Sequence, residues 1–156
     1  RVIHMAEALY VYGTFPQNLM SGKIADLSGG SQKLKVALLK RTHTLNQSRD
    51  NWNEIKADEI TDADYSAKEI TVNVSYSSLA TLLEAPTDCS FGAEVTITAG
   101  YAVIYDGRPA TDANRKLVGI IDFGAEKSSV DGNFKIEFGT VGEKTAILKL
   151  TAAAPA

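Results

Sequence analysis

Two stretches of the sequence alternate apolar residues with polar or small ones: Val95-Thr96-Ile97-Thr98-Ala99-Gly100-Tyr101-Ala102-Val103-Ile104-Tyr105-Asp106 and Leu117-Val118-Gly119-Ile120-Ile121-Asp122-Phe123-Gly124. Successive side chains of a β-strand point to opposite faces, so alternate residues share one face. The first stretch therefore predicts a strand whose odd-numbered residues, from Val95 to Tyr105, lie on one face. The second stretch predicts another strand, with Leu117, Gly119, Ile121 and Phe123 together on one face.

The segment between the two strands is polar and rich in turn-forming residues: Gly107-Arg108-Pro109-Ala110-Thr111-Asp112-Ala113-Asn114-Arg115-Lys116. We therefore expect a β-hairpin with a long, charged tip at residues 107–116. No pattern within the hairpin is typical of catalysis, which favours a structural or binding protein over an enzyme.

Further alternating segments predict strands at residues 33–39, 70–76, 79–84, 133–138 and 145–150. Their expected inward residues are Leu34, Val36 and Leu38, the even positions of 70–76, and Phe134, Ile136 and Phe138. The Asp-Gly pair in Val130-Asp131-Gly132-Asn133 predicts a tight hairpin turn. Residues 6–20 predict one short helix, with Thr14 at its start, Pro16 in its first turn and Gly22 after its end. Together these elements predict a mainly β fold, an antiparallel β-sandwich or barrel with a short N-terminal α-helix.

One domain is expected over residues 5–151, with residues 1–4 and 152–156 as flexible or partner-docked termini. The longest segment without clear periodicity, residues 41–67, is either a loop with a short helix around 53–57 or an interaction arm. Trp52 in this segment is equally consistent with an interface anchor and with a ring folded back onto the end of the sandwich.

Charge and cysteine content exclude several classes of function. The chain has 156 residues, a formal net charge of −3 and one cysteine. The negative charge argues against a nucleic-acid partner, and Lys33 and Lys35 fit the solvent face of a strand. Cys89 is expected to be a buried, unreactive thiol in a protein made in a reducing cytoplasm. No segment has the length and apolar character of a membrane span or a signal peptide.

Short motifs with catalytic or metal-binding associations lack their required context. Asp122-Phe123-Gly124 matches a kinase tripeptide, but the other kinase motifs are missing. The acids Asp58, Glu59, Asp62 and Asp64 lack the glycine and distal glutamate of an EF-hand and fit a solvated loop. His4 and His43, with only Cys89, are too few for a zinc site. We therefore expect no enzyme activity, no metal and no cofactor.

The order of motifs resembles a family of small tailed-bacteriophage virion proteins. The matching segments lie at residues 5–10, 35–39, 65–67, 101–106, 117–124 and 134–138, so the resemblance extends from Met5 to Leu150. It implies a structural role on the virion, either as a head decoration (cement) protein or as a head-fibre protein. It implies no catalytic residues.

From this resemblance we expect a capsid decoration protein that binds the major capsid protein and copies of itself, with a trimer as the first expectation. The candidate partner-contact residues are Trp52, Tyr65, Arg108 and Arg115. The alternative is a carbohydrate-binding adhesin module of a tail or head fibre, with Trp52, Tyr65 and Tyr76 stacking on sugar rings. A shielded Trp52 would argue against that sugar-binding surface.

Overall fold

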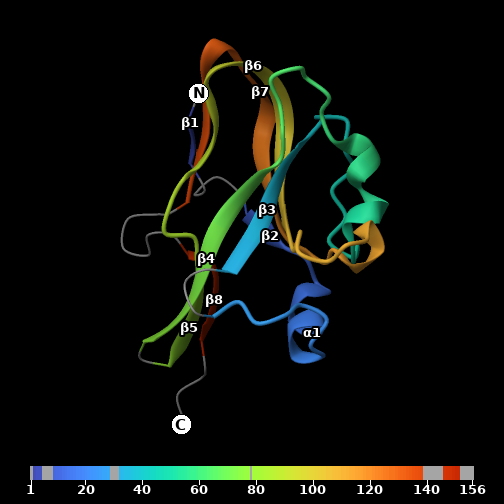
Figure 1. Ribbon diagram of the computed structural model, residues 1–156. Coiled ribbons are helices and arrows are strands. Elements are labelled where there is room, and N and C mark those ends of the chain that lie inside the picture. Colours follow the sequence, from blue (N-terminus) through green and yellow to red (C-terminus); the bar gives the residue numbers. More distant parts are fainter. Residues whose placement is uncertain (1, 5–8, 29–31, 78, 139–145, 152–156) are drawn as a thin grey trace.

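The computed structural model describes residues 2–4, 9–28, 32–77, 79–138 and 146–151 (Figure 1). The strands are β1 (Val2–His4), β2 (Leu9–Val11), β3 (Gln32–Leu39), β4 (Lys68–Ser77), β5 (Ala80–Glu84), β6 (Cys89–Tyr105), β7 (Leu117–Glu137) and β8 (Ala146–Thr151). The helices are α1 (Phe15–Met20) and the short 3-10 helices η2 (Trp52–Glu54), η3 (Lys56–Asp58) and η4 (Asp112–Asn114).

The strands form one sheet in the order β1-β7-β6-β3-β4-β5-β8, with β2 also paired to β7. Every pairing is antiparallel except that of β1 with β7. The sheet curls until it is nearly closed into a barrel. The predicted fold class is thereby confirmed, in its barrel form. Residues 2–4, predicted to be a loose or docked terminus, instead pair with β7, while residues 152–156 lie outside the described residues.

The predicted β6–β7 hairpin is present, but the side-chain alternation of β6 reverses at Gly100. Ile97 and Ala99 belong to the main core inside the barrel, whereas Tyr101 and Val103 belong to a second apolar cluster on the outer face of the sheet. The pairing of β6 with β7 shifts register between Ala99 and Tyr101. A bulge adds a residue to a strand and so transfers the following side chains to the opposite face. The expectation that all odd residues share one face is therefore wrong beyond Ala99.

A second irregularity moves Leu117 away from its predicted neighbours on β7. The register shifts between Ile104 and Tyr105, which pair with Gly119 and Leu117. Leu117 consequently lies in the outer cluster, while Ile121 and Phe123 face the barrel core as predicted.

Most other inward-facing predictions are confirmed. The side chains at positions 34, 36, 38, 70, 72, 134, 136 and 138 are buried in the barrel core. The exceptions are Val74 and Tyr76, which are 38% and 73% exposed. Val74 and Tyr76 lie in the part of β4 that pairs with β5. The predicted inward face of β4 is therefore buried only in its first half.

The predicted turn at Asp131-Gly132 does not form. Strand β7 continues through this position to Glu137, and Asp131 has a φ of 44°. The neighbouring pairs Val95–Gly132 and Ile97–Ser129 are out of regular register. The turn-like pair therefore produces a bulge within one long strand, not a hairpin between two.

The helix prediction is confirmed in its second half. Pro16 lies in the first turn of α1, Thr14 precedes the helix, and Gly22 follows it with a φ of 71°. Residues 9–11, which were included in the predicted helix, form β2 instead. The hydroxyl of Thr14 donates to the carbonyl of Arg49 at 3.1 Å, so this side chain fastens α1 to a distant loop.

The only cysteine is buried among the core side chains, as predicted, and burial raises the pKa of the Cys89 thiol to about 12. The thiolate is the reactive form, so we expect the native protein to resist thiol-specific reagents at pH 8. The same reagents should label Cys89 once the protein is unfolded in denaturant. Labelling at equal rates in both conditions would contradict the buried position.

Candidate functional site

The segment at residues 41–67, called the arm below, packs across the outer face of the sheet. Trp52 and Ile55 of the arm contact the outer cluster, which β3, β6 and β7 complete with Leu39, Val103 and Leu117 among others. Figure 1 shows the arm, with its two short helices, beside β3 and β6. Both faces of the central strands are therefore covered, and the arm forms the outer layer of a folded unit.

Trp52 is only 4% exposed, and its ring stacks on Tyr105 with the centroids 4.5 Å apart and the planes 2° from parallel. The contact-anchor interpretation of Trp52 does not fit this structure, because one face of the ring stacks on Tyr105 and the rest of the side chain is buried as well. For the same reason Trp52 cannot serve as a sugar-stacking surface in the adhesin alternative.

Tyr65 is half-buried and joins the arm to the sheet. Its hydroxyl accepts the backbone N–H of Leu38 at 3.0 Å and donates to Glu59 at 2.7 Å. Its ring lies 6.0 Å from that of Phe91. Burial raises the pKa of the Tyr65 hydroxyl, so it stays protonated and keeps donating to Glu59.

Arg108 folds back over the hairpin tip at residues 107–116. Its guanidinium donates to both carboxylate oxygens of Asp106, at 2.8 and 2.9 Å, and Asp106 itself is 1% exposed. The same guanidinium donates to the backbone carbonyls of Ala25 and Asp26, each at 3.0 Å. Arg108 thus fastens the segment after α1 to the base of the tip.

Arg115 shapes the other side of the tip. It donates to the carboxylate of Asp112 at 2.8 Å and to the carbonyl of Pro109 at 2.9 Å. Lys56 of the arm also donates to Asp112, at 2.8 Å. All four sequence-predicted contact residues therefore have roles within the fold, and the structure does not bring them together in one outward-facing group.

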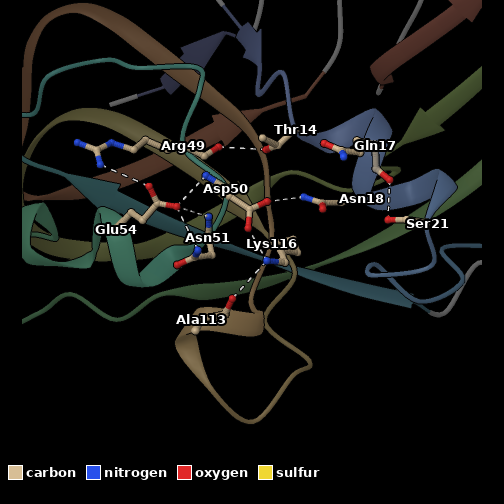
Figure 2. A network of polar contacts seen from close by, with 10 residues as sticks. All are labelled: Thr14, Gln17, Asn18, Ser21, Arg49, Asp50, Asn51, Glu54, Ala113 and Lys116. Atoms are coloured by element: carbon tan, nitrogen blue, oxygen red, sulfur yellow. Dashed lines mark hydrogen bonds and ion pairs between the residues drawn. The ribbon is translucent and has the colours of Figure 1, made fainter.

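A polar network centred on Asp50 joins α1, the arm and the tip (Figure 2). Asn18, buried on α1, donates to one carboxylate oxygen of Asp50 at 2.8 Å, and Lys116 donates to the other. Partial burial by itself raises the pKa of Asp50, but the hydrogen bonds from Lys116 and Asn18 outweigh it, and the pKa is lowered. The network therefore holds Asp50 as a carboxylate at neutral pH.

This network predicts a loss of stability in acid. The folded-state pKa of Asp50 lies below its unfolded value of about 3.9, so the stabilisation is complete above that pH and is lost as the pH falls through the folded-state pKa. We expect the difference in unfolding free energy between the native protein and Asp50→Asn to be largest at neutral pH and to shrink below about pH 4. Urea unfolding at a series of pH values measures it.

A matched variant separates the charge from the packing. Lys116→Met removes the ammonium donor but keeps Asp50, so the pKa of Asp50 should rise and its acid transition should move to higher pH. The other carboxylates are the same in the native protein and in both variants, so their contributions to the unfolding free energy cancel when the proteins are compared at one pH. A stability difference that stays constant from neutral pH to pH 3 would contradict the assigned role of Asp50.

The acidic side chains of the arm that were weighed as calcium ligands instead form contacts with other parts of the chain. Asp62 and Asp64 accept the backbone N–H groups of Thr98 and Thr96, at 2.8 and 3.0 Å. Asp58 contacts Nδ1 of the buried His43 at 2.7 Å. Among the residues that the structure describes, no group of three or more His, Cys, Asp or Glu side chains could hold a metal ion.

An apolar groove of about 380 Å³ lies between α1, with the segment after it, and the strands β4, β5 and β8. One wall comes from α1 and the segment after it, with Phe15, Leu19 and Ile24; the other comes from β4, β5 and β8, with Val74, Leu83 and Leu148. Met20, 88% exposed, follows Leu19 in sequence. Tyr76 lies two residues beyond Val74 and is on the same face of β4.

The groove was not anticipated from the sequence. The sequence of β4 did contain a relevant pattern, because the alternation of apolar and polar residues continues to Tyr76, which lies between Ser75 and Ser77. Alternation shows that these side chains share a face, but it does not show where the covering layer ends.

No helix within the described parts of the chain is both long and apolar enough to cross a membrane. Comparison of the chain with protein-family models, with curated proteins and with solved structures finds no significant match in any of the three.

Proposed function

We propose that the protein is a non-enzymatic structural component of a bacteriophage virion, a decoration protein that binds and stabilises the head lattice. The sequence resemblance of residues 5–150 to small virion proteins supports this proposal. The structural observation that carries it is the apolar groove, lined in part by the exposed Val74, with the exposed Tyr76 on the same face of β4. The charged loops of the same unit are held by internal hydrogen bonds. Exposed apolar surface beside a groove is typical of a protein–protein contact site.

The hydrogen bonds and ion pairs within the chain are consistent with a protein that functions by binding. Arg108, Arg115 and the Asp50 network hold the tip, the arm and α1 in one arrangement before any partner is met. A surface that is ordered in advance loses little conformational entropy when it binds. The rigid barrel would thus present the same contact surface at every copy.

Many weak contacts can stabilise a shell. A decoration protein bound at repeated, symmetry-related positions gains avidity, because each bound copy raises the effective concentration of its neighbours. The expected partners are the major capsid protein and further copies of this chain. The site of action is then the virion, after synthesis in the host cytoplasm.

Immunogold labelling of particles from the phage that encodes the protein tests the proposal. A decoration protein should give gold over the head, and particles made without it should break at a lower temperature and recover when purified protein is added. Gold confined to tails or fibres would favour the adhesin alternative. Particles that stay unlabelled, when the antibody binds purified protein, would remove the virion role.

A further inference from the structure

The groove wall formed by β4, β5 and β8 is a continuous apolar row. Val74 pairs with Leu83 across β4 and β5, and Leu83 pairs with Leu148 across β5 and β8. Directly opposite residues of antiparallel strands lie on the same face of a sheet. These three side chains therefore form a row that ends at Leu148, on the last strand of the sheet.

Within the described residues, the strand that ends this row, β8, is paired along one edge. Among the described residues, every pairing of β8 is with β5, and β8 is the terminal strand in the sheet order. The other edge of such a strand presents backbone N–H and C=O groups that can pair with a further strand. The position of this edge beside the apolar row means that an added strand would extend the row as well.

We infer that this edge and face form a self-association surface, on which a second copy of the chain docks with its own β8 antiparallel to the first. Self-association identifies one partner of the decoration protein proposed above, and it rests on that proposal for its biological setting. A twofold axis between the two strands gives an isologous contact, in which each copy contributes the same surface. Such a contact builds a dimer and not the trimer expected in the sequence analysis.

The sequence of β8 is complementary to itself in one register. If Leu148 lies opposite Leu148 of the second copy, the two apolar rows join into one, with Val74 at both ends. In this register Lys149 lies opposite Ile147 of the second copy, so no like charges meet. A register centred on Lys149 would place two lysines opposite each other, which is unfavourable.

The charges around the groove do not repel an identical surface. The exposed residues Lys23 and Asp26 carry opposite charges on the segment that forms one groove wall. A surface that carries both signs avoids the repulsion that a single sign would cause between two copies. Tyr76, 73% exposed on the face of the apolar row, supplies aromatic area of the kind enriched in interfaces.

Disulfide cross-linking of the full chain tests the register directly. Cys89 is buried with its thiol pKa raised to about 12, so an introduced cysteine is the only reactive one. Leu148→Cys should form a covalent dimer under mild oxidation, because directly opposite residues have Cβ atoms about 4.5–5.5 Å apart. Lys149→Cys is the matched control and should cross-link much more slowly. Equal rates for the two variants, or no dimer from Leu148→Cys, would overturn the proposed register.

Analytical ultracentrifugation of the protein without an introduced cysteine tests the self-association surface independently of any cross-link. The native protein should sediment as a dimer that dissociates on dilution, and Tyr76→Glu should weaken dimerisation at least about tenfold, because it places a carboxylate in an apolar contact. Val130→Glu changes an equally exposed apolar residue on β7 and should leave dimerisation unchanged. A monomer at all concentrations, or equal weakening by both variants, would overturn the inference.

These measurements use isolated protein, whereas the virion role is tested on particles. A monomeric protein that still labels phage heads would reject only the self-association surface. A dimer with the predicted register that labels no particle would reject only the virion role.

Discussion

Replacing Trp52 with alanine should lower the free energy of unfolding by about 3–5 kcal/mol, the range measured when a buried aromatic residue is truncated. The indole is 4% exposed and stacks on Tyr105. Its loss would open a cavity between the arm and the sheet. The backbone N–H of Trp52 also donates to the carbonyl of Arg115 at 2.9 Å, so a loosened arm would release part of the tip.

Urea unfolding followed by circular dichroism measures this effect in the native protein and the variant. Trp52→Phe is the control, since it keeps an aromatic ring over Tyr105 and should lose less than half as much stability. Trp52 is the only tryptophan in the chain, so acrylamide quenching of native fluorescence reports its burial separately. Efficient quenching in the folded protein, or a full-length Trp52→Ala protein as stable as the native one, would contradict the stacked arrangement.

Gly100→Ala should destabilise the protein by about 2 kcal/mol or more, since added atoms in a tightly packed site force the backbone to shift. A Cβ at position 100 would lie 2.5 Å from Cα of Arg41 and 2.8 Å from its Cβ. The arm leaves β3 at this point, and Arg41 is held by Asp122 at 2.6 Å and lies over the ring of Tyr101. The backbone of the arm therefore cannot retreat without breaking these contacts.

Gly132→Ala is the matched control on the same hairpin. A Cβ there would meet its nearest neighbour, the carbonyl oxygen of Val130, at 3.5 Å, which is ordinary contact. Thermal unfolding of both variants should show a clear loss for Gly100→Ala and little change for Gly132→Ala. Similar melting temperatures for the two would show that the arm does not approach β6 closely at Gly100.

Alternation predicted the strands well because it reports a local property, the face on which each side chain lies. It predicted the hairpin of β6 and β7 and the inward residues of β3, and it identified the fold class. It failed at Gly100 and at Asp131-Gly132, because a bulge depends on how one strand meets its partner. Gly100 also lies against Arg41, which is distant in sequence, so its surroundings could not be inferred from the local pattern.

The candidate site was less predictable than the fold. Trp52 and Tyr65 lie in the polar segment 41–67, and Arg108 and Arg115 in the hairpin tip, the two segments that the sequence predicts to reach a partner. In the structure their partners are Tyr105, Leu38, Asp106 and Asp112, and only Asp106 and Asp112 are close to their partners in sequence. Residue type alone does not distinguish a side chain that binds a partner from one that binds its own chain. The groove was not predicted because the sequence does not show that the side chains of β4 become exposed beyond Val72. Nor does it show that α1 lies opposite these side chains.

The long strand β7 also constrains the order of events during synthesis. It pairs with β6, with β2 near its start and with β1 near its end. The N-terminal strands cannot take their places on the ribosome until residues 117–137 have emerged, because their hydrogen-bonding partner does not yet exist. Pairing between segments so distant in sequence slows folding. The nascent chain would therefore remain without its complete barrel until most of it has been translated, and it would complete folding late, nearly as a single unit.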